Sequence, residues 1–368
     1  MPEVADIFRR YGGEYLRMFG PDMLPSHVRA FKDIQECRTP VLGGHVYSCD
    51  HCGHQEYAYH SCRNRSCPKC HTQDSQDWLQ ARQKDLLPVG YFHVVFTVPQ
   101  ELRLLVRSQQ RAFYTLLPRA AASAMIKLAA DPHYVGGLVG VLTVLHTWSR
   151  TLMYHPHVHC LVPGGGVSPH EEWRPARKNF LVPVKALSPI FRAMVRDAVA
   201  KELPDLKVPP AVWNKPWVVY SKPALAGPQA VLAYLGRYVH RVAITNRNIL
   251  SIDDGQVTFR YQECGESIWR TQTVAAGEFI RRFLQHALPA GCHKVRYYGL
   301  WSAAKRPLLR RVQILLALDP SADPPCPLPP LQDPPAPRPT LEGCRCPSCG
   351  QGVLRLSRQF KRHGRAPP

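Results

Sequence analysis

The pattern of apolar positions divides the chain into segments with different predicted secondary structure. Residues 1–36 carry apolar side chains at near-helical spacing, and residues 100–131 are also predicted to be helical. The run 91–98 is apolar on both faces, which predicts a strand inside a covered sheet. Residues 140–148 and 157–162 are two β-rich runs joined by a short polar segment, and this pattern predicts a β-hairpin.

The second half of the chain continues with strands and ends in a segment that cannot pack. A strand is predicted at residues 217–220, followed by a helix that begins near Pro228, because proline favours the first helical turn. Residues 248–274 have the turn signals of a three-stranded meander, and a basic amphipathic helix is expected at 278–286. Ten of the twenty residues 320–339 are proline, which predicts an extended, semi-rigid spacer.

Charge and cysteine content narrow the class of protein. The 368 residues include 47 Lys and Arg against 27 Asp and Glu, so the formal net charge is +20. This excess favours a polyanionic partner, most often nucleic acid. No apolar run reaches the roughly 18 residues of a membrane span, and the N-terminus lacks a signal-peptide pattern. We therefore expect a cytoplasmic protein, in which the thirteen cysteines are metal ligands instead of disulfides.

Two cysteine pairs near the N-terminus have the spacing of a zinc site. Cys49-x2-Cys52 and Cys67-x2-Cys70 are separated by fourteen residues, and two such knuckles typically supply four thiolates to one tetrahedral Zn²⁺. The sequence therefore predicts one site with these four ligands. Basic residues lie between and within the pairs, and we expect them to contact phosphate unless they form an ordinary solvated surface: Arg63, Arg65 and Lys69.

The remaining cysteines give weaker signals. Cys37 and Cys62 could form part of a second site with a nearby histidine. Cys346-x2-Cys349 is a single knuckle, which Cys344 and Cys326 could complete. The histidines that could take part in the second site are His45, His51, His54 and His60.

A cluster of histidines is the densest group of candidate ligands in the chain. Residues two apart on a strand point to the same face, so His157 and His159 form a two-imidazole platform for a divalent ion. If the hairpin turn lies near residues 151–152, His146 falls opposite His157 and could supply a third ligand. His93, on the apolar strand, is the competing candidate. Ligand softness alone would favour zinc at three imidazoles.

Two tyrosines lie on a predicted helix beyond the histidines. Tyr234 and Tyr238 are i and i+4, hence neighbours on one face, and Arg237 and Arg241 form a second such pair. Tyrosine pairs at this spacing are often core packing, but adjacent guanidinium groups argue against a buried face. A phenol with a pKa of about 10 acts as a nucleophile only toward an electrophile that is already activated.

The double knuckle, the His-Val-His strand and the tyrosine pair occur in this order between about residues 5 and 305. With these motifs in this order, the sequence resembles the bacterial rolling-circle transposases of insertion sequences. These proteins have a zinc-binding N-terminus, an HUH motif (two histidines that flank a bulky hydrophobic residue) and two tyrosines. The resemblance implies an α+β fold, with an antiparallel palm-like sheet of the HUH endonuclease type, flanking helices and a small zinc-ribbon-like N-terminal domain. It also implies histidines on a central strand and tyrosines on a facing helix.

The resemblance further implies a reaction and its cofactors. His157, His159 and His146 would hold Mg²⁺ or Mn²⁺, and the cysteines would hold Zn²⁺. Tyr234 or Tyr238 would attack single-stranded DNA at an element end, leaving a covalent 5′-phosphotyrosine and a free 3′-OH. Arg237 and Arg241 would bind the flanking strand, together with the basic residues of the zinc module. The expected location is the bacterial cytoplasm, on nucleoid-associated DNA.

The implied domain boundaries follow the changes in composition. We expect a helical and zinc-binding domain at 1–85, an HUH nuclease or transposase domain at 86–310, a Pro-rich linker at 311–342 and a basic Cys-containing tail at 343–368. Two alternative functions come from other classes: a non-catalytic zinc-ribbon protein that binds nucleic acid, and a three-histidine zinc hydrolase. A transposase with a carboxylate triad is disfavoured, because no acidic cluster stands out in the sequence.

Overall fold

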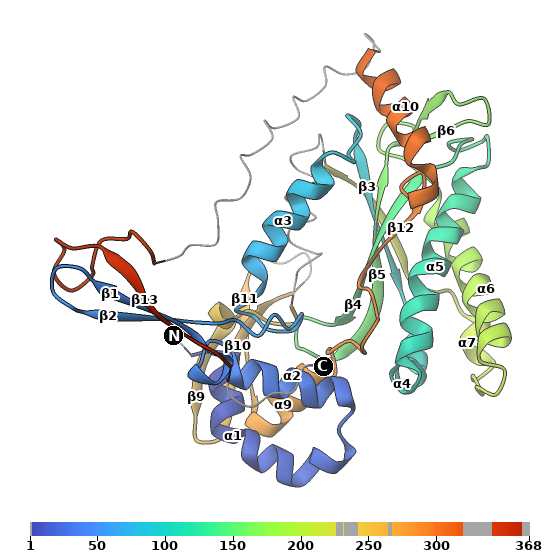
Figure 1. The fold of residues 1–368 in the computed structure, drawn as a ribbon. Coiled ribbons are helices and arrows are strands. Elements are labelled where there is room, and N and C mark those ends of the chain that lie inside the picture. The colour runs from blue at the N-terminus through green and yellow to red at the C-terminus, as the bar shows by residue number, and fades with distance from the viewer. Residues whose placement is uncertain (1, 226–230, 232–241, 264–266, 319–340, 363–368) are drawn as a thin grey trace.

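The computed structural model describes residues 2–225, 231, 242–263, 267–318 and 341–362, with the backbone alone for 71–76, 224 and 225. Within these ranges the chain is a mixed α+β fold with antiparallel sheets (Figure 1). The helices are α1 (Val4–Phe19), α2 (Pro25–Glu36), α3 (His71–Gln83), α4 (Arg103–Ser108), α5 (Gln110–Ala129), α6 (Val184–Glu202), α7 (Ala211–Asn214), α9 (Ala276–Leu284) and α10 (Arg306–Leu318).

The largest sheet has five strands in the order β12-β4-β5-β3-β8, and every neighbouring pair is antiparallel. Its strands are β3 (Tyr91–Thr97), β4 (Gly140–Trp148), β5 (Tyr154–Pro163), β8 (Val219–Leu225) and β12 (Val295–Gly299). The smaller sheets comprise β1 (Gly44–Cys49), β2 (Gln55–Tyr59) and β13 (Leu354–Phe360); β9 (Ile249–Asp253), β10 (Gln256–Gln262) and β11 (Trp269–Ala275); and β6 (Gly165–Val167) with β7 (Trp173–Pro175). The hairpin β4–β5 therefore occupies the middle of the main sheet.

The two faces of the main sheet have different neighbours. Helices α5 and α6 cover one face (Figure 1), and Val158 of β5 is fully buried there in a cluster with Phe113 of α5 and Phe191 of α6. Because side chains alternate along a strand, His157 and His159 point to the other face. That face has its own smaller apolar cluster, which includes residues of β3, β4, β5 and α3 and also Val231.

A separate core joins the N-terminal helices to a segment more than 200 residues later. Phe8 of α1 contacts Phe31 of α2, with ring centroids 5.2 Å apart, and meets Phe283 of α9 edge-on at 5.5 Å. All three side chains are almost completely buried. Helices α1, α2 and α9 thus pack with the sheet β9–β11 as one unit, which confirms the helices predicted within residues 1–36 but adds a packing partner that local patterning does not reveal.

Most predicted elements are present, with small shifts. The strand at 91–98, the hairpin, the meander and the basic helix after it correspond to β3, β4–β5, β9–β11 and α9. The strand predicted at 217–220 instead begins at Val219 and runs to Leu225. Helix α10 continues to Leu318, past residue 311 where the Pro-rich segment was expected to begin. The helix predicted near Pro228 lies outside the described residues.

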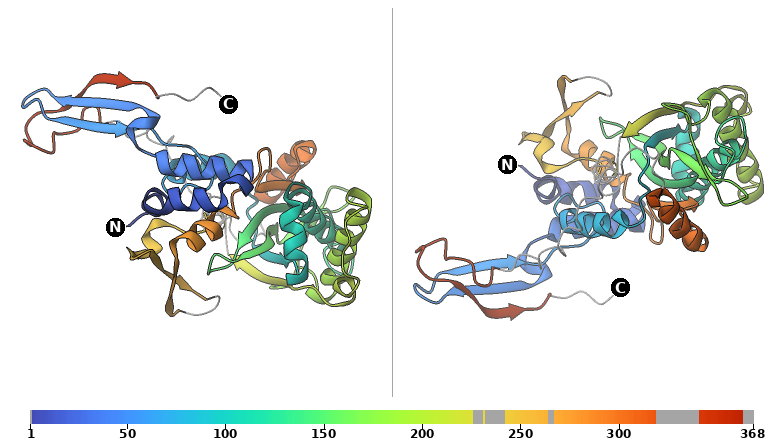
Figure 2. Two further views of the ribbon diagram at one scale, coloured as in Figure 1. Left: turned by 90° about the horizontal axis from the view of Figure 1, so that it is seen from below. Right: turned by 90° about the horizontal axis from the view of Figure 1, so that it is seen from above.

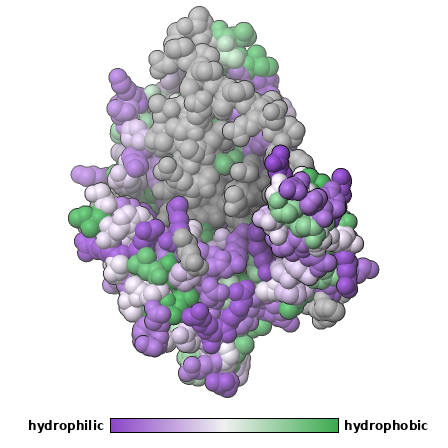
Figure 3. Space-filling view, turned by 90° about the vertical axis from the view of Figure 1, so that its left-hand side faces the viewer, coloured by the Kyte–Doolittle hydropathy of each residue, from purple (hydrophilic) through white to green (hydrophobic). Residues whose placement is uncertain are grey.

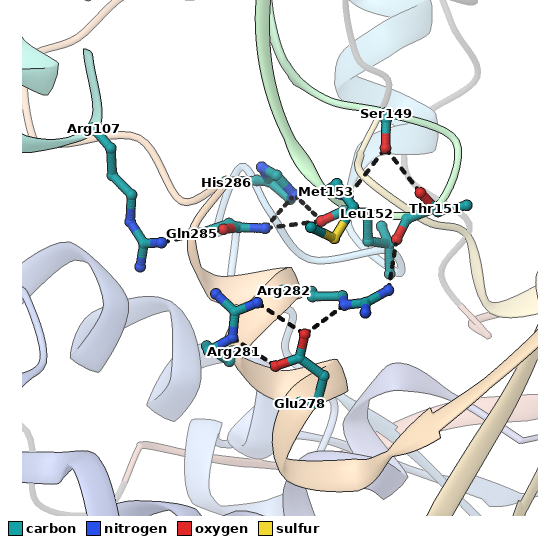
Figure 4. Close-up of polar contacts among 10 residues, drawn as sticks. All are labelled: Arg107, Ser149, Thr151, Leu152, Met153, Glu278, Arg281, Arg282, Gln285 and His286. Atoms are coloured by element: carbon teal, nitrogen blue, oxygen red, sulfur yellow. Dashed lines mark hydrogen bonds and ion pairs between the residues drawn. The ribbon is translucent and has the colours of Figure 1, made fainter. Parts of the chain in front are cut away.

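A network of polar contacts fixes the turn of the β4–β5 hairpin (Figure 4). Leu152 lies in this turn with φ +62°, a left-handed conformation that costs a leucine roughly 1–2 kcal/mol. Its carbonyl accepts hydrogen bonds from the Gln285 amide at 2.8 Å and the His286 imidazole at 3.0 Å. Its side chain is fully buried in the core formed by α1, α2 and α9. These contacts stabilise an otherwise unfavourable turn.

Charged side chains of helix α9 also hold the same turn. Glu278 accepts hydrogen bonds from Arg281 at 2.6 Å and Arg282 at 2.7 Å, and Arg282 donates to the Thr151 carbonyl at 3.2 Å. The hydrogen bonds from Arg281 and then Arg282 lower the pKa of Glu278 to about 2. The carboxylate therefore stays ionised at neutral pH and orients the arginine that holds the turn.

The buried His286 makes the stability of this arrangement dependent on pH. Burial lowers the pKa of His286 to about 3, so the imidazole is neutral in the folded state. In the unfolded chain its pKa is near 6.5, hence the unfolded state binds the extra proton first as pH falls. We expect this residue alone to reduce the free energy of unfolding by about 2 kcal/mol between pH 7 and pH 5.

Chemical denaturation at several pH values measures the free energy of unfolding of the wild type and of His286→Gln. The variant should lose less stability than the wild type between pH 7 and pH 5, although it starts less stable. His133→Gln removes an exposed histidine and should keep the wild-type pH slope. Equal slopes in the wild type and His286→Gln would contradict the assignment.

Candidate active site

Three histidines meet on the face of the main sheet opposite to α5 and α6. His146 lies on β4 directly opposite His157 on β5, and His159 follows two residues later on the same face. One ring nitrogen of each histidine lies within 4.8 Å of the others. The prediction that His146 faces His157 across the hairpin is confirmed. The register of two strands therefore suffices to bring the three imidazoles together.

Neighbouring groups fix the orientation of these rings. The Nδ1 of His157 is 2.7 Å from the backbone carbonyl of His155, and the Nδ1 of His159 is 2.8 Å from the Nε2 of His93. In metal sites, such a bond to one ring nitrogen sets the tautomer and directs the other nitrogen to the ion. His146 is 2% exposed and stacks on Trp148, with ring centroids 4.6 Å apart.

His93 is a neighbour of the cluster rather than a member of it. Burial and the positive charge of Lys222 lower its pKa to about 4, so it is neutral. It touches His159, whereas the ring nitrogens that converge belong to His146, His157 and His159. Of the two candidates for the third ligand, the geometry favours His146. A set of three imidazoles fits a divalent transition-metal ion.

Eight of the cysteines that the structure describes form two groups of four, and the predicted single site is wrong. Cys67 and Cys70 lie with two cysteines that gave weaker signals in the sequence, Cys37 and Cys62. Within this group the Sγ atoms of Cys37 and Cys70 are 3.4 Å apart, and those of Cys62 and Cys70 are 3.6 Å apart. Sulfur atoms bound tetrahedrally to one zinc at about 2.3 Å lie about 3.8 Å from each other. This group is called the inner tetrad below.

Cys49 and Cys52 belong to the second group, with Cys346 and Cys349 from the other end of the chain. The physical reason for the separation is the hairpin β1–β2. Cys49 and Cys52 lie at the turn of this hairpin, whereas Cys67 and Cys70 follow its other end. A strand of five or six residues is about 17–20 Å long, so the hairpin keeps the two pairs apart. Cys344 is exposed and outside the group, and Cys326 lies outside the described residues. This group is called the outer tetrad.

The predicted DNA-binding residues are in different environments. Arg65 donates hydrogen bonds to the carbonyls of Cys292 and Pro289, which joins the inner tetrad to the loop before β12. Lys69 forms an ion pair with Glu3. Arg63 is exposed. The four remaining candidates, Tyr234, Tyr238, Arg237 and Arg241, lie outside the described residues.

A large basic cavity opens beside the histidine cluster. Its volume is about 830 Å³, and Trp148, which stacks on His146, lies in its wall. Cys62 of the inner tetrad and Val242 also line it. The lining includes one acidic residue, Asp33, and these cationic ones: Arg29, Arg63, Arg65, Arg107, Arg111 and Lys294.

Local sequence patterns do not indicate this cavity, because its cations come from distant segments. Arg107 and Arg111 lie around the junction of α4 and α5, and Lys294 precedes β12. Lys294 extends over the Trp148 ring, 4.8 Å from the centroid. On the face shown in Figure 3, hydrophilic side chains predominate among the coloured residues, and hydrophobic ones form small scattered groups. No helix in the described ranges has the length and apolar character of a membrane span.

Comparison with known proteins agrees with this geometry. Residues 140–307, which include the histidine hairpin, match a family described as "Putative transposase", and residues 7–98 match a "Transposase zinc-binding domain". The chain is 39% identical over 375 residues to "Putative transposase y4qJ" of Sinorhizobium fredii, covering 96% of this chain and 94% of the relative. The chain belongs to the IS91/IS801 family of transposases.

A second relative agrees with this assignment. The "Transposase for insertion sequence element IS801" of Pseudomonas savastanoi pv. phaseolicola is 27% identical over 297 residues, covering 74% of this chain and 69% of the relative. No solved structure matches the chain significantly. The protein is therefore an insertion-sequence transposase, an enzyme that acts on DNA, with an N-terminal zinc-binding domain.

The histidine geometry makes a prediction about metal binding. His146→Gln should weaken Mn²⁺ binding by about 10-fold or more, because it replaces one converging imidazole nitrogen with a weaker ligand. His133→Gln, remote and exposed, should bind Mn²⁺ like the wild type. Isothermal titration calorimetry measures the Mn²⁺ affinity of both variants, and thermal unfolding shows whether each variant is folded. Unchanged affinity in His146→Gln with a loss in His93→Gln would show that His93 is the third ligand.

Proposed function

We propose that this transposase nicks and joins single-stranded DNA at the ends of its element through a covalent 5′-phosphotyrosine, in a rolling-circle-like reaction. The observation that carries the proposal is the position of the three-histidine cluster next to a cationic cavity. A site for a divalent ion beside a site for phosphates is what phosphoryl transfer on DNA requires.

We assign the main sheet the role of an HUH nuclease palm, and the positions of its histidines support this assignment. His157 and His159 lie on β5, the middle strand of the five, and His146 lies on the adjacent strand β4. Helices α5 and α6 cover the opposite face, so the histidine face is the one available to a substrate. Val158 anchors the strand in the core between the two histidines.

We assign His146, His157 and His159 as ligands of Mg²⁺ or Mn²⁺, and the cysteine tetrads as ligands of Zn²⁺. Imidazole softness alone would favour zinc at the histidines, but phosphoryl transfer on DNA commonly uses the harder ions. A bound divalent ion would polarise the scissile phosphate. The protein's own contribution is to hold the imidazoles of His157 and His159 oriented, through the carbonyl of His155 and through His93.

Tyr234 or Tyr238 is the proposed nucleophile. Its phenolic oxygen forms a bond to the phosphorus, the bond from phosphorus to the 3′ oxygen breaks, and the phenolic proton balances the charge on the released 3′ oxygenate. The second tyrosine allows a later transesterification without an external energy source.

Two described residues that flank the tyrosine segment support this assignment. Val231 packs on the histidine-bearing face with Leu142 and Leu161, and Val242 lines the cavity that contains Trp148.

The cavity is the proposed path of the DNA strand. Its cations would contact the phosphates of the strand. Arg237 and Arg241 would bind the strand from the tyrosine segment, together with Arg63 and Arg65 of the cavity wall. We assign Lys69 a lesser role, since it is paired with Glu3.

The first test is the covalent adduct. Wild-type protein with labelled single-stranded element ends and Mg²⁺ should give an SDS-stable, protease-sensitive adduct. The double variant Tyr234→Phe with Tyr238→Phe should form none, because it lacks both hydroxyls, whereas Tyr57→Phe, which changes an exposed phenol on β2 of the N-terminal ribbon, should behave like the wild type.

Other outcomes distinguish the alternative functions. An adduct in the double variant would overturn the tyrosine assignment. Cleavage that survives loss of both tyrosines and leaves no adduct would indicate a three-histidine zinc hydrolase acting through metal-bound water. Strand binding without a nick under any metal would indicate a non-catalytic binding protein.

The second test concerns the cavity. Arg63→Gln with Arg111→Gln should weaken binding of single-stranded DNA several-fold at low salt. It should also reduce the slope of log affinity against log salt by about 0.7 for each phosphate that the variant no longer neutralises. The matched control, Arg196→Gln with Lys201→Gln, removes the same charge from α6, at residues that do not line the cavity. Equal effects in the two double variants would show that only net charge matters and that the cavity is not the path.

A further inference from the structure

The two ends of the chain meet in one small sheet. Strand β13 pairs antiparallel with β1, from Gly44 opposite Phe360 to Cys49 opposite Leu354. In both views of Figure 2 this three-stranded ribbon extends away from the rest of the molecule. Residues matched by the zinc-binding family end at position 98, so β13 and the loop before it lie outside that match.

The outer tetrad lies at the tip of this ribbon and is built from two similar turns. The Sγ atoms of Cys49 and Cys349 are 3.8 Å apart, and those of Cys52 and Cys346 are 3.7 Å apart. These separations match the about 3.8 Å expected for tetrahedral sulfur ligands of one zinc.

Each turn has the form Cys-x2-Cys-Gly with the glycine in the left-handed region. Gly53 has φ +73° and Gly350 has φ +67°, and each donates its N–H to the carbonyl of the first cysteine of its turn. Backbone N–H groups also approach the sulfurs, including that of Cys52 to Cys49 Sγ at 3.4 Å. Two turns with the same construction, facing each other across a sheet, are typical of zinc knuckles.

The ribbon is too small to hold the C-terminal segment by hydrophobic packing. Its cluster of buried residues contains four members, two of which are ligands of the tetrad: Tyr47, Cys49, Cys346 and Leu354. The exposed side of β13 is polar or charged at most positions. A module of this size usually requires a metal or another covalent or coordinate link for stability.

The two turns nevertheless approach closely. A Cβ at Gly352 would lie 2.4 Å from Cys49 Sγ, so only glycine fits there. The backbone of Asp50 donates to the Val353 carbonyl at 3.1 Å, and the Asp50 carboxylate accepts from the Val353 N–H at 2.8 Å. These contacts align the two turns. Without a bound cation, the close approach of four thiols would contribute little to the stability of the fold.

We propose that Cys49, Cys52, Cys346 and Cys349 bind one structural Zn²⁺ that attaches the C-terminal segment to the N-terminal ribbon. This site is separate from the inner tetrad and from the histidine cluster. Binding releases protons from thiols and forms four Zn–S bonds without any change in oxidation state. The N-terminal turn and the C-terminal turn each supply two ligands, so neither turn binds the ion by itself.

Zinc content of the full-length protein tests the shared site. Cys346→Ser with Cys349→Ser should remove one zinc per chain relative to the wild type, measured by elemental mass spectrometry. Cys49→Ser with Cys52→Ser should also remove one, and the combination of all four substitutions should remove no more than one. Cys344→Ser, the matched control, should keep the wild-type content. Unchanged zinc in Cys346→Ser with Cys349→Ser, or a loss of two ions in the fourfold variant, would overturn the proposal.

A second measurement does not depend on how the variants fold. A protease site is introduced between residues 319 and 340 of the otherwise unaltered protein, and the chain is cleaved after purification. The fragment that contains β13 should co-elute with the body in zinc buffer and separate after chelation. Release of the fragment in zinc buffer, or its retention after verified zinc removal, would contradict a zinc-dependent attachment. Neither readout involves DNA cleavage, so failure here leaves the proposed transposition chemistry to its own test.

Discussion

The pairing of β4 with β5 is the constraint on which the candidate site depends. It sets His146 opposite His157, and a slip of one residue would turn His157 and His159 into the core. The turn that fixes this register includes Leu152 in a left-handed conformation, held by Gln285 and His286 beyond the end of α9. Helix α9 packs in turn on α1 and α2. The N-terminal helices thus stabilise the geometry of a site more than a hundred residues away.

This architecture also brings the zinc-binding part next to the histidine-bearing sheet. The inner tetrad follows α2, and its Cys62 lines the same cavity as Trp148. Arg65 connects that tetrad to the loop before β12 through backbone carbonyls. Zinc there would order one wall of the cavity, while the sheet supplies the other wall and the histidines. Under the proposed function, metal sites of two kinds would act on one DNA strand, one by shaping its path and one at the reacting phosphate.

Local patterns predicted the hairpin and the meander because their alternation is carried by adjacent residues. They could not predict which cysteines share a site, since Cys49 meets Cys349 only after the chain has folded back over 300 residues. Helices α3, α6 and α10 and strands β12 and β13 were not predicted, and β13 depends on a partner at the far end of the chain. The domain boundaries near residues 85 and 310, and the roles of Tyr234 and Tyr238, stay predictions.

The ion at the histidines is proposed to act directly on the scissile phosphate, and a phosphorothioate substrate tests this most directly. A single-stranded element end is prepared with sulfur in place of each non-bridging oxygen of that phosphate in turn. Direct contact predicts that one of the two isomers is cleaved poorly with Mg²⁺ and that Mn²⁺, which binds sulfur more readily, restores its cleavage. Equal sensitivity of both isomers in Mg²⁺ and in Mn²⁺ would contradict direct contact between the ion and the phosphate.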